Sequence, residues 1–242
     1  FSWGSALGSV APDFPDTQFA IIDMVVEGPN VRSIVFNEHE GSFLVGVLAA
    51  MAAEGDTVSF VGGMDIPLIS KFACGYAQGV KYVKPDANVI VNMTGTTPAA
   101  WNDPVKGGEL TKAQISQGSE VVFAAAGGTG LGVLQTAADE GILSIGVDSN
   151  QNYLQPGSVL TSMVKRVDNA VYESFMAGTE LETGTISVMG LDNEGVGYSL
   201  DEFNAELVSD EMKAAVEEAK AKIIAGEIIV HDYMSDESCP AY

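Results

Sequence analysis

Residues 57–93, TVSFVGGMDIPLISKFACGYAQGVKYVKPDANVIVNM, decide the fold class. An apolar β run opens this stretch at 57–61, and another closes it at 88–93. Between them, the apolar residues of 69–83 recur at helical spacing. A strand, a helix and a second strand in this order predict a parallel pairing of the two strands.

The same alternation of short β runs and longer helical stretches continues on both sides of this segment. Its β runs are almost continuously apolar, which is typical of a parallel sheet covered by helices on both faces. The expected fold class is therefore α/β. The expected strands are 17–23, 57–61, 88–93, 120–124, 143–147, 159–164 and 186–189, with a short β run at 228–233, and the expected helices are 40–53, 69–83, 104–117, 133–140, 168–177 and 210–225.

The charge balance excludes some classes of partner. The 242 residues include 33 Asp and Glu against 11 Lys and Arg, which gives a formal net charge of −22. Such a field repels phosphate backbones and anionic lipids, so we expect neither nucleic acid nor a membrane surface as a partner. Arginine, which binds phosphate through two parallel hydrogen bonds, occurs only at Arg32 and Arg166.

Cysteine and histidine are too few and too scattered to predict a metal site or a redox motif. Cys74 and Cys239 form no CxxC pair, and neither His39 nor His231 has a partner at ligand spacing. We therefore expect no metal and no cofactor. In an exported protein the two cysteines could form a disulfide, but the sequence does not show whether their geometry permits it.

The segments that follow the expected strands point to a binding site. In a parallel α/β sheet, ligands bind beyond the carboxyl ends of the strands. These segments are rich in glycine and small polar residues and also contain one Trp, which suits a concave site for a small polar ligand. They are GGMD (62–65), TGTTPAAWND (94–103), AAGGTG (125–130), VDSNQ (147–151) and SMVKR (162–166).

The glycine-rich loop GGTGLG at 127–132 raises the alternative of a dinucleotide-dependent enzyme. It follows a strand, and Asp148 follows the next strand, as in a dinucleotide site, but the loop does not match G-x-G-x-x-G because residue 133 is Val. These glycines equally suit a close approach of the backbone to a ligand, or only a tight turn. No G-x-S-x-G, nucleophile with a base, or metal-ligand cluster is evident, so we do not expect an enzyme.

Several longer segments, which together run through nearly the whole chain, carry a family resemblance. They are FPDTQFAIID (14–23), NEHEGSFLVGVLAAM (37–51), FVGGMDIPLISKFACGYAQGVKYVKPD (60–86), AAAGGTGLGVLQTA (124–137) and IGVDSNQNYLQPGSVLTSMVKRVDNAVY (145–172). Together they resemble the basic membrane protein family, the substrate-binding components of ABC importers. The best understood members of that family bind purine nucleosides.

The resemblance implies a type I periplasmic-binding-protein fold, with two α/β lobes joined by hinge crossovers. On this mapping, residues 1–36 and 165–182 belong to the first lobe, and residues 37–164 and 183–242 to the second. Family members normally begin earlier, with a strand and helix that carry an aromatic and Asp or Asn ligand contacts. We therefore expect part of the first lobe to lie outside this chain.

The resemblance also implies individual ligand contacts. Trp101 matches an aromatic residue that stacks on the base, and a flat indole suits this because stacking is worth about 1–3 kcal/mol per base. Asp148 matches the acid that accepts hydrogen bonds from ribose hydroxyls, which are strong because they are charge-assisted. Lys165 matches a lysine that reaches the sugar or this acid. Each residue also has an interpretation without a ligand. Trp101 could be an ordinary packed aromatic residue, Asp148 a turn or helix-cap residue, and Lys165 a solvent-exposed surface lysine.

The remaining expected contacts are less specific. Gly127 matches a backbone contact, and Asn102 adjoins Trp101 in the AWNDP turn. Ser5 is a departure, since the family often has Asp at this position as a second hydroxyl acceptor. A serine hydroxyl is an uncharged acceptor, so its hydrogen bonds lack the charge assistance of a carboxylate. The substitution therefore leaves the affinity or the ligand preference of this protein open.

The resemblance thus implies an extracytoplasmic solute-binding protein, periplasmic or lipid-anchored, that closes on adenosine, guanosine or inosine and then contacts a membrane permease. We expect it to be a monomer. The alternatives are a sugar or autoinducer receptor of the same fold, a surface signalling protein that binds nucleosides without feeding a transporter, and the dinucleotide-dependent enzyme.

Overall fold

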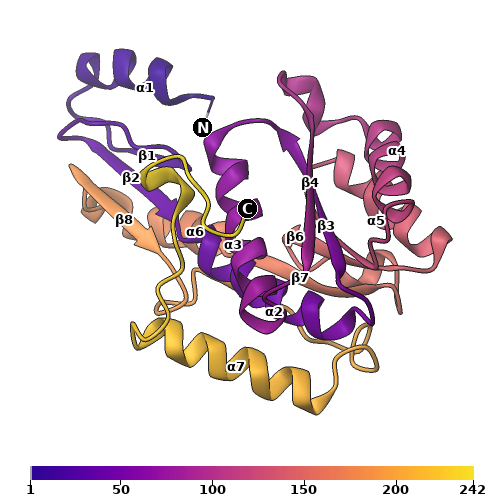
Figure 1. Cartoon of the computed structure of the whole chain (residues 1–242). Coiled ribbons are helices and arrows are strands. Elements are labelled where there is room, and N and C mark those ends of the chain that lie inside the picture. The colour runs from indigo at the N-terminus through magenta and orange to yellow at the C-terminus, as the bar shows by residue number, and fades with distance from the viewer. Residues whose placement is uncertain (1) are drawn as a thin grey trace. The chain divides into compact units, whose positions relative to one another are not determined.

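The structure is a computed structural model and describes residues 2–242 (Figure 1). The chain folds into two compact units. Unit 1 comprises the residues up to Asn37 together with Arg166–Val196, and unit 2 comprises Glu38–Lys165 together with Gly197–Tyr242. The chain therefore passes from one unit to the other after residues 37, 165 and 196.

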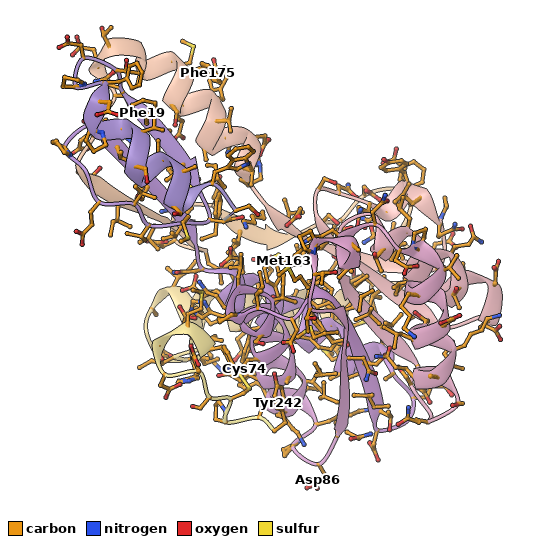
Figure 2. The ribbon with its side chains drawn as sticks, turned by 90° about the horizontal axis from the view of Figure 1, so that it is seen from above. Phe19, Cys74, Asp86, Met163, Phe175 and Tyr242 are labelled. Carbon is orange, nitrogen blue, oxygen red and sulfur yellow. A yellow bond between two sulfur atoms is a disulfide. The ribbon has the colours of Figure 1, made fainter. Side chains whose placement is uncertain are left out.

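Unit 1 is built on a small parallel sheet in the order β1-β2-β8. Ile22 of β1 pairs with Ile34 of β2, and Phe36 of β2 pairs with Met189 of β8. Phe19 and Phe175 line a groove on this unit (Figure 2). The elements of unit 1 are α1 (Gly4–Val10), η1 (Ala11–Asp13), β1 (Phe19–Ile22), β2 (Val31–Phe36), α6 (Val167–Ala177), η4 (Gly178–Glu180) and β8 (Thr185–Met189).

The sequence places residues 183–196 in the second lobe, whereas the structure places them in unit 1. The physical reason is the strand pairing, because β8 adds to β2 in parallel over five residue pairs. Strand β2, which the list of expected strands omits, is therefore the central strand of the unit 1 sheet.

Unit 2 contains a larger sheet in the order β4-β3-β5-β6-β7-β9. The neighbours from β4 to β7 pair in parallel, as the alternation in the sequence predicts. The strands are β3 (Thr57–Met64), β4 (Asn88–Gly95), β5 (Val121–Ala125), β6 (Leu143–Asp148), β7 (Val159–Lys165) and β9 (Val196–Tyr198), whose first residue falls in unit 1. The helices are α2 (Glu38–Ala52), α3 (Pro67–Val83), η2 (Pro98–Trp101), α4 (Pro104–Ile115), α5 (Thr129–Glu140), η3 (Asn152–Leu154), α7 (Asp210–Ile224) and η5 (Tyr233–Ser235).

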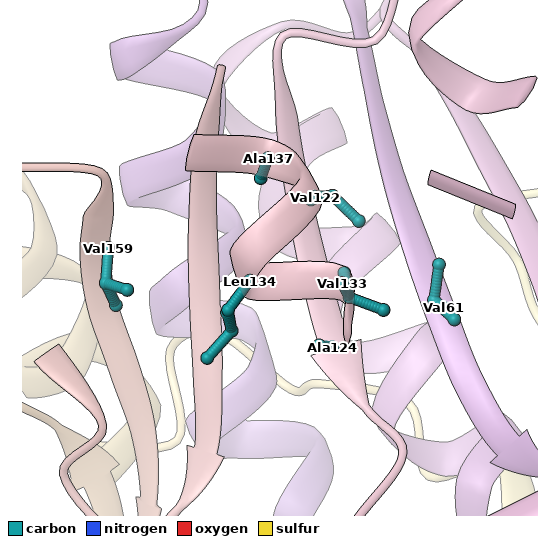
Figure 3. Packing of buried hydrophobic residues seen from close by; sticks show 7 residues of the cluster. All are labelled: Val61, Val122, Ala124, Val133, Leu134, Ala137 and Val159. Carbon is teal, nitrogen blue, oxygen red and sulfur yellow. The ribbon is translucent and has the colours of Figure 1, made fainter. Parts of the chain in front are cut away.

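Strand β5, in the middle of this sheet, is buried along its whole length. Because successive strand residues point to opposite sides, both faces of the sheet are covered there. Phe123 of β5 points to α3, where its ring centroid lies 5.4 Å from that of Tyr76. Val122 and Ala124 point the other way and pack against α5 (Figure 3). The full cluster on the α5 side is Val61, Val122, Ala124, Val133, Leu134, Ala137 and Val159.

Helices α2 and α3 pack unusually closely on one side of the sheet, and glycine makes this possible. A Cβ atom at Gly79 would lie 2.0 Å from the carbonyl oxygen of Phe43, and one at Gly75 would lie 2.3 Å from that of His39. Contacts this short between a side chain and a backbone are excluded sterically. The small residues of α2 and α3 therefore place the two helix backbones in direct contact.

The expected β run at 228–233 is wrong. This segment forms no strand, because the side chain of Gln78, and not a neighbouring strand, makes hydrogen bonds with its backbone N–H and C=O groups. Gln78 accepts a hydrogen bond from the backbone N–H of His231 at 2.8 Å and donates one to the backbone oxygen of His231 at 3.0 Å. The C-terminal segment (226–242) is also tied to α3 by a disulfide between Cys74 and Cys239, whose Cα atoms lie 5.7 Å apart.

Candidate functional site

The carboxyl ends of the unit 2 strands lie along one edge of the sheet, and most of the expected ligand contacts lie there. Trp101 and Asn102 follow β4, and Gly127 follows β5. Asp148 is the last residue of β6, and Lys165 is the last residue of β7. In a parallel sheet these ends share one edge, so the fold brings five of the six expected residues to the same side of unit 2.

Trp101 is half-buried at the end of η2 and rests on two glycines. A Cβ atom at Gly63, near the end of β3, would lie 2.3 Å from Cζ3 of the indole. A Cβ atom at Gly127 would lie 3.2 Å from the backbone oxygen of Trp101, and Gly127 has a φ of +57°. Gly63 therefore leaves the space in which the indole lies, and Gly127, which follows β5, allows a close approach to the backbone of Trp101.

The turn that carries Trp101 is fixed by a buried threonine. Thr129, the first residue of α5, donates a hydrogen bond from Oγ1 to the backbone oxygen of Ala100 at 2.7 Å. The same Oγ1 accepts a hydrogen bond from the backbone N–H of Asp103 at 2.8 Å. Asn102 lies between these two anchored residues and is exposed. The turn therefore holds Trp101 in place through bonds on both sides.

The start of α5 differs from the expectation in a way that bears on this turn. The sequence predicts a helix from residue 133, with a glycine loop before it, whereas α5 begins at Thr129. The glycines at 130 and 132 thus belong to the first turn of the helix. A Cβ atom at Gly132 would lie 1.9 Å from the backbone oxygen of Pro104, so glycine here allows α4 and α5 to approach.

Asp148 is exposed and has an unusual backbone conformation. Its φ of +64° lies in the left-handed region, which Asp tolerates better than most residues with a Cβ atom. The neighbouring backbone is fixed, because the N–H of Val147 donates to Oε1 of Gln151 at 2.9 Å. Conformations of this kind cluster at functional sites, where the surrounding structure determines them.

Lys165 is buried, with its residue 6% exposed, which the interpretation as an ordinary surface lysine does not accommodate. Its Nζ atom lies 2.9 Å from Oε1 of Glu38, a residue of the first turn of α2 that is only 1% exposed. The same Nζ lies 5.9 Å from the centroid of the Phe72 ring. A carboxylate and an aromatic face therefore hold the ammonium group.

Glu38 is not among the expected contacts, because the expected strands omit β2, which ends two residues before it. Its Oε2 atom lies 3.0 Å from Nζ of Lys71, and the same Nζ lies 3.4 Å from Oδ2 of Asp232 in the C-terminal segment. The only signal in the sequence is an acid close to the HEGSFL segment. Nothing there distinguishes Glu38 from Glu40.

The sixth expected residue, Ser5, belongs to unit 1. It is exposed on α1, and its backbone oxygen accepts a hydrogen bond from Oγ of Ser9 at 3.0 Å.

The carboxyl edge of the unit 2 sheet carries an aromatic side chain, a carboxylate and an ammonium group. This combination of side chains suits a ligand with a flat ring and several hydroxyls. Among residues 2–242 there is no group of three or more His, Cys, Asp or Glu side chains that could hold a metal ion.

Over the same residues, the structure contains no helix with the length and apolar character needed to cross a bilayer.

The fold and the edge of the unit 2 sheet define a class of protein, the solute-binding proteins of the type I periplasmic-binding fold. The chain is 30% identical to a solute-binding protein of an ABC transporter system from Aeropyrum pernix, with a TM-score of 0.84 over 96% of this chain and 75% of that one. Residues 2–233 match the model of the Bmp family, described as ABC transporter substrate-binding protein PnrA-like. The chain belongs to this family. Since the family consists of substrate-binding proteins, this confirms the expectation that the protein is not an enzyme.

Two curated relatives are similar over almost all of this chain. The ABC transporter nucleoside-binding protein BmpA of Lactococcus lactis subsp. cremoris is 34% identical over 95% of this chain and 69% of its own length. A lipoprotein of Pyrococcus abyssi is 34% identical over 96% of this chain and 64% of its own length. The chain thus spans about two thirds of the length of these relatives.

Proposed function

We propose that this protein binds a purine nucleoside at the carboxyl edge of the unit 2 sheet and delivers it to an ABC permease. One arrangement carries the proposal: a half-buried indole resting on two glycines, on the same sheet edge as an exposed carboxylate and a buried, ion-paired ammonium group. A nucleoside has the matching parts, a flat heterocycle joined to a sugar with neighbouring hydroxyls.

Each side chain has a defined role in this proposal. The indole of Trp101 stacks on the purine, for which about 1–3 kcal/mol per base is typical. The carboxylate of Asp148 accepts hydrogen bonds from two vicinal ribose hydroxyls, and the ammonium group of Lys165 donates to a sugar oxygen. Loss of the hydroxyl that Lys165 contacts would take this partner from a buried ammonium group, at a cost of roughly 1–3 kcal/mol.

The relatives support the class of ligand and the location. The Lactococcus relative is named as nucleoside-binding, and the Pyrococcus relative as a lipoprotein. We propose accordingly that this protein acts outside the cytoplasm, as a monomer with or without a lipid anchor, and that its partner is the membrane permease of an importer. The net charge of −22 argues against a nucleic-acid ligand.

Isothermal titration calorimetry on the full natural polypeptide tests the proposal. Adenosine, guanosine, inosine, the free purines, ribose, a hexose and NAD are titrated separately. The expected result is binding of at least one purine nucleoside, at least tenfold tighter than that of its free base or of ribose. Binding of a sugar without binding of a nucleoside would favour the sugar or autoinducer receptor. Binding of NAD alone would favour the dinucleotide-dependent enzyme.

A further inference from the structure

Glu38 is a buried carboxylate shared by two lysines. Its Oε1 atom lies 2.9 Å from Nζ of Lys165, and its Oε2 atom lies 3.0 Å from Nζ of Lys71. All three side chains are at most 7% exposed. A buried charge is costly unless it is paired, so these three groups depend strongly on one another.

The shared carboxylate also fixes the position of the Lys165 ammonium group. Lysine is a flexible chain with three donors, and a free lysine head points in many directions. Here one donor direction is taken by Glu38, while the Phe72 ring lies 5.9 Å from the same nitrogen. Lys165 ends β7, so the anchor acts at the sheet edge where Asp148 ends the neighbouring strand β6.

The other end of the cluster is anchored as well. Lys71 of α3 lies 3.4 Å from Oδ2 of Asp232, so two carboxylates and two ammonium groups alternate. The formal charges of these four groups balance, and Glu38 pairs with both lysines. The position of Glu38 is thus set from α3 as well as from its own helix.

We propose that Glu38 is a positioning residue for ligand binding, which holds the ammonium group of Lys165 where it donates to the sugar of a bound nucleoside. This inference rests on the proposed function, because it assigns Lys165 to the sugar. Glu38 does not touch the ligand. It acts by preorganising a donor, and a preorganised donor loses less conformational freedom on binding.

A double-mutant cycle on the full natural polypeptide tests this role. The variants Glu38→Gln, Lys165→Gln and the double variant are titrated with inosine, 2′-deoxyinosine and 3′-deoxyinosine. Each single change is expected to weaken inosine binding by roughly tenfold or more, and the double change is expected to be little worse than Lys165→Gln, since coupled residues are non-additive. The preference for inosine over at least one deoxy analogue should shrink in Glu38→Gln, because the sugar contact is the one that is lost. A general structural defect would weaken all three ligands equally.

The controls separate the possible failures. Glu54→Gln makes the same chemical change at an exposed position and is expected to bind as the wild type does. If Glu38→Gln does not fold by circular dichroism, Glu38→Asp keeps the charge with a shorter reach and should show a smaller loss with the same change in preference. If the wild-type protein binds no nucleoside, the proposed function fails and this role with it. If the wild type binds and the Glu38 variants keep both the affinity and the preference, only the role of Glu38 is overturned. If Lys165→Gln has no effect, the sugar contact assigned to Lys165 is overturned together with the role of Glu38, while nucleoside binding by the wild type still stands.

Discussion

A Cβ atom at Gly63 would lie 2.3 Å from Cζ3 of Trp101 and 2.4 Å from its Cε3. The six-membered ring of the indole therefore rests directly on the backbone of β3. No side chain can be added at residue 63 without moving the ring, because real Cβ contacts are not this short. The glycine at this position thus sets the placement of the aromatic plate at the sheet edge.

The first prediction follows from this contact. Gly63→Ala is expected to displace the indole and to weaken nucleoside binding at least tenfold, since overpacking in a buried site typically costs about 1–3 kcal/mol. Calorimetry measures the affinity. Tryptophan fluorescence in a Trp3→Phe background reports on Trp101 alone, because the chain has two tryptophans. Gly197→Ala is the matched control, since nothing lies within 4 Å of a Cβ atom there. Unchanged binding and fluorescence in Gly63→Ala would remove Trp101 from the proposed site.

The second prediction concerns Asp148. Asp148→Ala is expected to weaken nucleoside binding at least tenfold without unfolding the protein, because an exposed carboxylate contributes little to packing. Asp148→Asn removes the negative charge and keeps the backbone conformation, since Asn also tolerates the φ of +64° found here. It therefore shows how much of the loss of affinity comes from the charge alone. Asp86→Ala removes another exposed carboxylate and should bind like the wild type. Equal affinities in all of these proteins would exclude Asp148 from the ligand contacts.

Most of the unit 2 fold could be predicted from the sequence, because its signals are local. Apolar runs gave the strands near residues 57, 88, 121, 143 and 159, and their alternation with helices predicted the parallel order that the structure confirms. The strand ends also indicated where Trp101, Asp148 and Lys165 would lie. These features depend on the order of strands and helices along the chain and on the spacing of apolar residues, and both can be seen in the sequence.

The errors arise where distant residues determine the local structure. The apolar segment at 228–233 has a β-like composition, but Gln78 satisfies the backbone of His231 and no strand forms. Glu38 resembles any acid in a first helical turn, and only the folded chain brings Lys71 and Lys165 to it. The sequence could not show either relationship, since each joins residues that lie 33 to 153 positions apart.

The third prediction concerns the disulfide between Cys74 and Cys239, which joins residues 165 positions apart. Removing a crosslink that closes such a long loop typically lowers the free energy of unfolding by about 2–5 kcal/mol. The double variant Cys74→Ser/Cys239→Ser should therefore unfold at lower urea concentration than the oxidised wild type. Dithiothreitol should destabilise the wild type and leave the double variant unchanged. A wild-type midpoint that is insensitive to dithiothreitol would contradict the prediction.

The fourth prediction concerns salt. With a formal net charge of −22 over 242 residues, the folded chain repels itself, and salt screens this repulsion. The Debye length falls from about 10 Å at 0.1 M salt to about 3 Å at 1 M. The melting temperature should therefore rise as NaCl is added. Sucrose does not screen charge, so a comparison with sucrose separates screening from a general effect of added solute, and a melting temperature that falls with NaCl would contradict this account.

The fifth prediction concerns His39, which is 7% exposed beside the Glu38 and Lys71 pair. Burial, together with the nearby charge of Lys71, lowers the pKa of His39 from 6.5 to about 4. Between these two values the unfolded chain binds a proton at this position that the folded chain does not. The free energy of unfolding therefore decreases as the pH falls from 6.5 towards 4, by at most about 1.4 kcal/mol per pH unit from this residue.

Urea unfolding at a series of pH values from 4 to 7 measures this contribution. His39→Gln should lose less stability than the wild type as the pH falls, because glutamine does not take up a proton. The carboxylates titrate in both proteins, so the difference between the two curves isolates His39. If the wild-type and His39→Gln curves run parallel throughout, His39 does not remain neutral in the folded protein.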